Sequence, residues 1–326
     1  MPTVDRLYKY LTGIVGSPTV VFLLLAVGVL AYSAYPSILL NGVGFFTRTV
    51  WDARLNGKIV TVNGIQTTAG SSFGILVFLI DTLASSAIAL IIAVPAALGS
   101  AIFLTQVAPR RVAAPVSLMV EMLAGIPSVI YGFWGFLVLG PYLLNSFEPF
   151  LARNFSFIPF LAGPVDSYGL LAAGIILAIM IIPIIASISR DMMTRAPKEL
   201  REGAKALGLT RWEVTRKIVL PFAKTAIVGS TILGLGRALG ETMAIAMLLG
   251  AGNHQLPVNL YSPASTIGAF MLLELGNAQS DPSGIDLSAL MELAVVLLLI
   301  TVAVNVVARL LIRQGFATSS ENIVRV

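Results

Sequence analysis

The sequence predicts an all-α, polytopic membrane protein with six transmembrane helices. Hydrophobic residues make up 57% of its 326 residues, charged residues only 11%, and the mean hydropathy is +0.91. A soluble domain of this length cannot bury so much apolar surface. Six apolar runs reach the roughly 17 to 20 residues that a bilayer-spanning helix needs: 18–40, 73–104, 116–140, 168–189, 222–251 and 286–312.

The first run has two interpretations. Arg6 and Lys9 precede it, as basic residues precede the apolar part of a signal peptide, and residues 31–33 weakly resemble a cleavage site. The apolar stretch continues through Leu40, however. We therefore expect an uncleaved first span.

Basic residues predict the orientation of the spans. Sixteen of the 21 Lys and Arg residues fall in four segments: 1–16, 105–115, 190–224 and 305–326. Only four fall in the three segments between them: 41–72, 141–167 and 252–285. Cytoplasmic loops of membrane proteins are enriched in Lys and Arg. We therefore expect both termini in the cytoplasm, with a cytoplasmic N-terminus at 1–16, a transmembrane domain at 17–316 and a cytoplasmic tail at 317–326.

The external loop 41–72 contains a signal for a β-hairpin. β-Branched residues flank Asn63-Gly64, a pair that accepts the positive φ angles of a type I′ turn. The loop 141–167 is rich in Phe and Pro, which suits the headgroup region of a membrane. A small structural cover on the outer face is the expected role of the hairpin.

Pro127 interrupts the third run, between Gly125 and Ser128. A proline removes one helical hydrogen bond, and membrane helices tolerate this only where neighbouring groups compensate. We therefore expect a bend. The bend either serves packing or lines a pathway.

The basic loop at 190–221 predicts a short amphipathic helix. This helix is expected to start with Pro197 at the N1 position and to stop at Gly208, which can adopt the left-handed conformation that ends a helix. Three residues at helical spacing form a narrow apolar stripe: Leu200, Ala204 and Leu207.

A second short helix is expected to follow in the same loop. Thr210 and Glu213 have the spacing of a capping box, and Leu209 and Val214 that of a hydrophobic staple. Paired helices with caps and an apolar stripe favour docking to another protein. A solvated connector is the alternative.

The same loop resembles the EAA loop of ATP-binding-cassette (ABC) importer permeases, whose pattern is E-A-A-x-x-x-G followed by nine residues and I-x-L-P. Six positions match: Glu202, Ala204, Gly208, Ile218, Leu220 and Pro221. Gly203 departs from the pattern, which has Ala there, and weakens the helix by up to about 1 kcal/mol. The resemblance implies a type I ABC importer permease fold, with a cytoplasmic coupling helix between helices 4 and 5 that seats in a cleft of the ATPase subunit.

The fifth run contains two opposite charges, Arg237 and Glu241, among apolar and small residues. Arg237 is expected about 20 Å of helix beyond Lys224, near the middle of the bilayer, where a guanidinium costs roughly 2.5–3.5 kcal/mol. Glu241 lies four residues later, on the same face of a continuous helix, and can pair with Arg237. A structural ion pair is one interpretation. The other is that Arg237 binds a tetrahedral oxyanion in a pathway, while Glu241 holds the guanidinium when the pathway is empty.

Three stretches resemble phosphate-specific importer permeases of the PstC type: LAGIPSVIYGFWG, GRALGETMAIAM and the opening segment through YPSILLNGVGFFTRTVWD. The resemblance extends from the first span to the last, although the loop 41–72 and the tail after Arg313 match poorly or give no basis for comparison. It implies that the chain forms half of the translocation path of an ATP-driven inorganic phosphate importer. It also implies that Arg237 and Glu241 are tied to phosphate passage.

The resemblance implies four kinds of partner: a second permease of the PstA type, an ATPase dimer of the PstB type, an extracytoplasmic phosphate-binding protein of the PstS type, and the lipid of the cell membrane. The chain has no G-x-x-x-x-G-K-[ST] phosphate loop. We therefore expect a permease that is not an enzyme and binds no cofactor itself, with ATP and Mg bound by the partner ATPase.

Several alternatives and absences complete the prediction. A PstA-type permease shares the EAA loop, a molybdate or sulfate permease also needs an oxyanion site, and a stand-alone secondary anion transporter also needs a buried arginine. Three carboxylates, Asp81, Glu121 and Glu292, lie towards the ends of spans, where they can reach the interface, and no role is assigned to them. No catalytic residue, metal site or nucleic-acid surface is predicted, and the chain has no cysteine.

Overall fold

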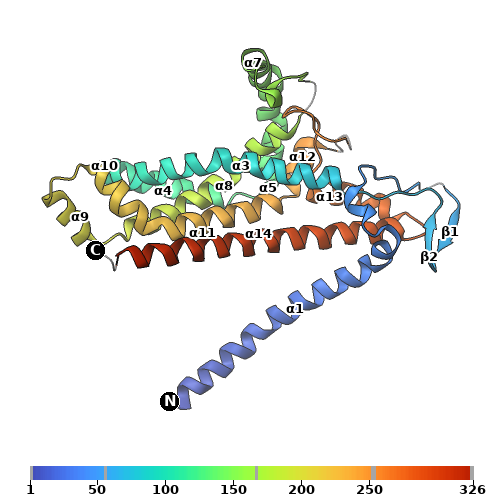
Figure 1. Ribbon diagram of the computed structural model, residues 1–326, viewed down its shortest axis with the longest axis horizontal. Helices are drawn as coiled ribbons and strands as arrows, with labels where there is room; N and C mark the ends of the chain where they lie inside the picture. The colour runs from blue at the N-terminus through green and yellow to red at the C-terminus, as the bar shows by residue number, and fades with distance from the viewer. Residues whose placement is uncertain (1–2, 55–56, 166–167, 251–254, 324–326) are drawn as a thin grey trace. The chain divides into compact units, whose positions relative to one another are not determined.

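The computed structural model describes residues 3–54, 57–165, 168–250 and 255–323. Helices dominate this part of the chain (Figure 1). Six of them are long and apolar enough to cross a membrane: Leu11–Asn41, Leu76–Val107, Ser128–Asn154, Leu170–Thr194, Arg211–Leu239 and Ile285–Val307. The predicted all-α class and the predicted number of spans are confirmed.

The α-helices are α1 (Thr3–Asn41), α2 (Gly44–Thr47), α3 (Leu76–Ile102), α4 (Arg110–Ala124), α5 (Ser128–Trp134), α6 (Gly140–Tyr142), α7 (Glu148–Asn154), α8 (Leu170–Thr194), α9 (Lys198–Ala206), α10 (Arg211–Val214), α11 (Leu220–Leu239), α12 (Met243–Leu249), α13 (Ile267–Gln279) and α14 (Ile285–Ile323). Wider π-turns join several of them: η1 (Phe103–Val107), η2 (Gly135–Leu139), η3 (Leu143–Phe147) and η5 (Thr215–Val219). A 3-10 turn, η4, covers Pro159–Leu161.

Contacts within the chain define two compact units. The first comprises residues 1–76 with 274–298, and the second comprises residues 77–273 with 299–326. The first unit contains α1, α2 and the beginning of α14. The second contains α3 from Val77 onward, α4 to α12, the beginning of α13 and the rest of α14.

The first unit contains the predicted β-hairpin. Strands β1 (Ile59–Val62) and β2 (Ile65–Thr68) pair antiparallel, with Val62 opposite Ile65. Asn63 and Gly64 both have positive φ, at 54° and 80°, as a type I′ turn requires. The hairpin is therefore confirmed, and it extends beyond the C-terminal end of α1 (Figure 1).

Hydrogen bonds between buried polar groups join α1 to α14 in the first unit. The Ser37 hydroxyl donates to Glu292 Oε2 at 2.6 Å, and the Ser288 hydroxyl donates to the Ser33 carbonyl at 2.8 Å. Glu292 is buried. Its interpretation as an interfacial carboxylate is therefore wrong, because the neighbouring helix supplies a hydroxyl donor that satisfies it inside the protein.

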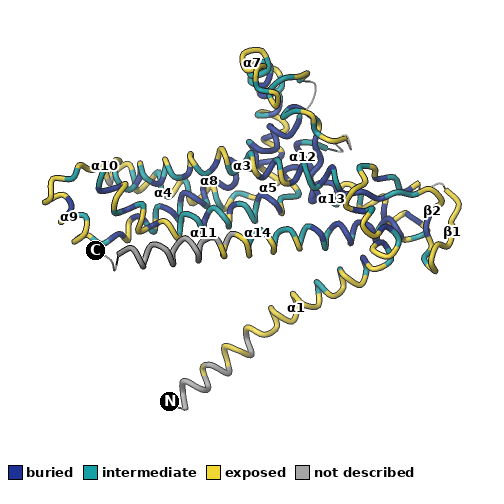
Figure 2. The backbone as a smooth tube through the Cα atoms, viewed as in Figure 1, coloured by how far each residue is buried: buried dark blue, intermediate teal, exposed yellow. Residues whose placement is uncertain are grey.

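Helix α8 forms the centre of the second unit. Figure 2 shows it as the most continuously buried of the long helices, whereas α1 is exposed along most of its length. Small residues let α11 approach α8 closely: a Cβ atom on Gly234 would lie 3.0 Å from Ile185 Cδ1. The hydroxyls of Ser189 and Ser230 lie 3.4 Å apart in the same contact. The hydrophobic effect does not drive helices together in lipid, so van der Waals packing at such close contacts stabilises their association instead.

The predicted third span, 116–140, is wrong in its limits. Helix α4 ends at Ala124, and a new helix starts at Ser128 and continues to Asn154. Pro127 has no N–H and disfavours helical geometry at the residue before it, so the chain breaks rather than bends. The segment 141–154, which we expected in a headgroup loop, is helical because Pro141 and Pro149 occupy first turns, where a missing N–H is tolerated.

Candidate functional site

A helix break separates Arg237, in α11, from Glu241, in the linker between α11 and α12. Helix α11 ends at Leu239 with Gly240 as its C-cap, and α12 begins at Met243. The expectation of one continuous span at 222–251 is therefore wrong, and so is the expectation that both charges share one helix face. Non-helical backbone at membrane depth is tolerated only where protein surrounds it or where it lines a cavity.

Arg237 lies in the last turn of α11, where the partial negative charge of the helix C-terminus stabilises a cation. Its side chain is partly buried. Among the residues that the structure describes, none accepts a hydrogen bond from the Arg237 guanidinium or forms an ion pair with it. The guanidinium therefore retains donors for a ligand.

Glu241 lies two residues before the first residue of α12, Met243. Its Oε1 accepts the backbone N–H of Ala244 at 3.2 Å, and a carboxylate is favoured at this end of a helix. The predicted pairing of Glu241 with Arg237 is not formed, because the helix break supplies each charge with its own helix terminus. In this conformation Glu241 does not hold the guanidinium.

Tyr131 of α5 is a third member of this region, and the sequence did not single it out. Its hydroxyl donates to the Leu123 carbonyl at 2.9 Å, across the break between α4 and α5. The Arg237 guanidinium lies within electrostatic range of the Tyr131 phenol. The sequence did hold one signal for this role, because Tyr131 lies four residues after Pro127. Carbonyls that lose their helical partner at a proline break need another hydrogen-bond donor.

Close packing of α5 against α12 brings the two breaks together. A Cβ atom on Gly132 would lie 2.7 Å from Ala244 Cα, so only glycine permits this approach. Tyr131 and Ala244 belong to the same buried apolar cluster. We name the region formed by Tyr131, Arg237 and Glu241 the double-break region.

The loop at 190–221 contains the two predicted helices. Pro197 is the N-cap of α9 rather than its N1 residue, and α9 ends at Ala206 with Gly208 in the left-handed conformation at a φ of 85°. The capping box of α10 is confirmed: Glu213 Oε2 accepts the Thr210 N–H at 2.9 Å, and Thr210 Oγ1 accepts the Glu213 N–H at 3.3 Å.

The apolar stripe of α9 has little protein to contact within this chain. Leu200 is 56% exposed and Leu207 is 83% exposed, whereas Ala204 is buried. A Cβ atom on Gly203 would meet no atom within 4 Å. The other residues of the EAA resemblance range from exposed to partly buried: Glu202 and Pro221 are exposed, and Ile218 and Leu220 are partly buried.

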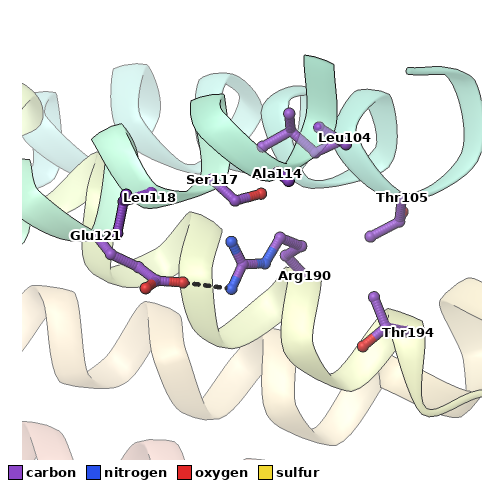
Figure 3. A pocket seen from close by; sticks show the side chains of 9 residues that line it. Leu104, Thr105, Ala114, Ser117, Leu118, Glu121, Arg190 and Thr194 are labelled. Carbon is purple, nitrogen blue, oxygen red and sulfur yellow. Dashed lines mark hydrogen bonds and ion pairs between the residues drawn. The ribbon is translucent and has the colours of Figure 1, made fainter. Parts of the chain in front are cut away.

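A separate cavity of about 490 Å³ opens between η1, α4 and α8 (Figure 3). Arg190 lines it, and its Nη2 lies 2.6 Å from both Glu121 Oε1 and Asp191 Oδ1. In Figure 3 the Glu121 and Arg190 side chains point toward one another. Two carboxylates already neutralise this guanidinium, so the cavity suits an anion less well than the double-break region does.

Comparisons with known proteins identify the family. Residues 93–314 match the family described as "Binding-protein-dependent transport system inner membrane component". The chain belongs to this family. It is a multi-pass membrane component of a transport system that has further components, and such components are not enzymes themselves.

Relatives of this transport component match most of its length. It is 40% identical to the "Phosphate transport system permease protein PstC 1" of Mycobacterium tuberculosis over 88% of this chain and 86% of that protein. It is 39% identical to the "Phosphate transport system permease protein PstC" of Haemophilus influenzae over 95% and 94% of the two chains. A solved MetNI methionine ABC transporter in an inward-facing conformation is 20% identical, with a TM-score of 0.48, over 73% of this chain and 94% of that one.

Proposed function

We propose that this chain is a permease subunit of an ATP-driven inorganic phosphate importer, in which it forms half of the translocation path. The names of its relatives support phosphate as the solute. The single observation on which the site assignment depends is that the Arg237 guanidinium has no hydrogen-bond or ion-pair partner among the residues that the structure describes. Phosphate is a tetrahedral oxyanion, and the planar fork of an arginine can bind two of its oxygens at once.

The helix break explains how Arg237, which has no partner among the described residues, can persist in a transmembrane segment. The C-terminal carbonyls of α11 stabilise Arg237 when no anion is bound. A full ion pair with Glu241 would compete with phosphate, and no such pair forms. The Glu241 carboxylate instead accepts a hydrogen bond from the Ala244 N–H of α12. Its negative charge in this region favours release of a bound anion.

The loop at 190–221 supports coupling to an ATPase. On α9 the side chains of Leu200 and Leu207 are exposed, and there is open space above Gly203. Such a helix can fit into a cleft of a partner protein. We propose that α9 docks on an ATPase dimer of the PstB type, which binds ATP and Mg. The concentration of Lys and Arg in this loop and at the termini supports a cytoplasmic location for these segments.

The remaining partners follow because a subunit that forms half of a translocation path needs a second subunit to complete that path. A second permease of the PstA type would complete the path, and a binding protein of the PstS type would deliver phosphate from outside. Residues 17–316 act as the transmembrane domain in this assembly. ATP binding moves the coupling helix and opens the permease pair outward, and hydrolysis returns the pair to the inward-facing form.

The proposal is tested by ATP-dependent uptake of radiolabelled phosphate into proteoliposomes that contain the complete complex. Arg237→Ala should lower uptake at limiting phosphate by about 10- to 150-fold, because a hydrogen bond to a charged group contributes about 1.5–3 kcal/mol. Arg237→Lys should also be impaired, since lysine cannot bind two oxygens in one plane. Arg153→Ala is the control, because Arg153 is an exposed arginine at the end of another span.

Unchanged uptake in both Arg237 variants would remove Arg237 from the pathway. Equal competition by sulfate or molybdate would assign the permease to another oxyanion. Uptake that continues without the ATPase and its ATP would instead favour a stand-alone anion transporter.

A further inference from the structure

Asp81 is a fully buried carboxyl group in an apolar transmembrane helix. It lies in the second turn of α3, and its exposed fraction is 0%. Its Oδ2 accepts the backbone N–H of Ser265 at 2.7 Å, just before α13 begins. Its Oδ1 has no hydrogen-bond partner among the described residues. The interpretation of Asp81 as an interfacial carboxylate is wrong, because it is enclosed by the second unit.

The residue after Asp81 makes a second bond to the same helix terminus. Thr82 Oγ1 accepts the N–H of Ile267, the first residue of α13, at 2.9 Å, while its hydroxyl donates to the Phe78 carbonyl at 2.6 Å. The first N–H groups of a helix have no acceptor within the helix. Here side chains of α3 supply acceptors at the start of α13. One turn away, the rings of Phe78 and Phe270 stack with centroids 4.0 Å apart. The first turn of α13 is thus fixed to α3 (Figure 1).

The first turn of α13 in turn contacts the double-break region. A Cβ atom on Gly268 would lie 2.9 Å from the Glu241 carbonyl oxygen and 2.7 Å from Thr242 Oγ1. Only a glycine at this position lets the two backbones approach so closely. The next residue, Ala269, lies in the same buried cluster as Ala238 and Ile245, which flank the break on either side. The backbone between α11 and α12 therefore rests on α13.

We propose that Asp81 is a positioning residue for the anion site: through Ser265 and the first turn of α13, it sets the position of the Glu241–Thr242 backbone. A carboxyl group is suited to this task, because its oxygen accepts an N–H near a helix N-terminus, where the first N–H groups have no partner within the helix. Asp81 touches neither Arg237 nor the solute. The expected effect of Asp81 on transport rests on the proposed phosphate pathway. The expected effect of Asp81 on the position of the Glu241–Thr242 backbone does not.

The chain contains no cysteine, so Met243→Cys introduces a single thiol at the first residue of α12, where Met243 is exposed. The rate of maleimide labelling of this thiol in the reconstituted complex reports the position of the break without reference to transport. Asp81→Ala should change this rate by about 10-fold or more, the population change that corresponds to leaving the buried Ser265 N–H without an acceptor. Asp81→Asn retains an oxygen acceptor for Ser265 and should remain within about twofold of the parent.

A second measurement is the amount of phosphate transported per ATP hydrolysed. A displaced site should lower this ratio in Asp81→Ala, whereas a general folding defect would lower uptake and ATP hydrolysis together. Ser86→Ala is the matched control, since Ser86 is buried on the same helix and its hydroxyl has no partner among the described residues. If Asp81→Ala fails to assemble, Thr82→Val removes the acceptor for Ile267 instead.

The outcomes separate the two proposals. Unchanged labelling in Asp81→Ala and Thr82→Val would overturn the positioning role, whatever happens to uptake. Changed labelling with an unchanged ratio of phosphate to ATP would support the link from Asp81 to the break and would remove the break from the phosphate pathway. Changes in both, with rescue by Asp81→Asn, support both proposals.

Discussion

Gly132 of α5 lies so close to Ala244 of α12 that the two helices have almost no side-chain space between them. A Cβ atom on Gly132 would lie 2.7 Å from Ala244 Cα and 2.9 Å from the Ala244 carbonyl oxygen. This contact brings the break before α5 next to the break before α12. Two interruptions that are separate in the sequence thereby form one polar region inside an apolar unit.

Gly132→Ala should destabilise the complex by about 1–3 kcal/mol and impair uptake, because the new methyl group meets backbone atoms that cannot rotate away. Thermal unfolding of the purified complex and phosphate uptake measure the two effects. Gly229→Ala is the control, since a Cβ atom there meets nothing within 4 Å. Equal stability of the two variants would contradict the close approach of α5 and α12.

Tyr131→Phe should lower stability by about 0.5–1.5 kcal/mol, the usual contribution of one hydrogen bond. The lost bond joins the Tyr131 hydroxyl to the Leu123 carbonyl across the break between α4 and α5. Tyr142→Phe, at an exposed tyrosine of the same span, should leave the midpoint of thermal unfolding unchanged. If Tyr131→Phe behaved like this control, the hydroxyl would have no structural role at the break.

Leu200→Ser and Leu207→Ser should weaken association with the ATPase while leaving the fold of the chain intact. Burying each leucine contributes about 1.5–3 kcal/mol, so affinity should fall by roughly 10- to 150-fold. Co-purification of the ATPase and ATP-dependent uptake provide the measurements. Lys198→Ser changes an exposed residue of the same helix and should have little effect. Normal association of both leucine variants would exclude α9 as the docking helix.

Stability should decrease at acidic pH through Asp281, which lies just before α14. Burial raises the pKa of Asp281, but hydrogen bonds from the backbone N–H groups of Asp286 and Ser283 outweigh this and hold the pKa below its ordinary value. A depressed pKa contributes stability that is present above the unfolded value of about 3.9 and is lost as pH falls through the folded value.

Asp281→Ala should therefore flatten the dependence of the unfolding temperature on pH below about pH 4. Thermal unfolding of the complex across this range is the measurement, and Glu199→Ala, at an exposed carboxylate of α9, is the control. The same acid dependence in Asp281→Ala and in the parent protein would rule out this contribution.

The sequence predicted the features that depend on local pattern. Hydropathy was sufficient for the number of spans, Asn63-Gly64 for the hairpin, and the spacing of Thr210 and Glu213 for the capping box. These features arise from residues close together in the chain. No tertiary contact was needed to recognise them.

The double-break region could not be predicted in the same way. Whether Pro127 bends or breaks a helix depends on donors such as the Tyr131 hydroxyl, and whether Gly240 ends a helix depends on the packing of Gly268 beyond it. Arg237 and Glu241 were recognised by their charge, but their pairing was predicted from a continuous helix that does not exist. Asp81 was missed because its partner, Ser265, lies 184 positions away in the sequence.

The packing of α11 on α8 also bears on how the protein is made. The ribosome delivers α8 before α11, so the surface that receives Gly234 and Ser230 is already in the membrane when the nascent segment carrying Arg237 arrives. A transmembrane segment that carries an arginine inserts poorly by itself. Helix α8 can therefore assist the insertion of α11, because it is synthesised first and offers α11 a packing surface.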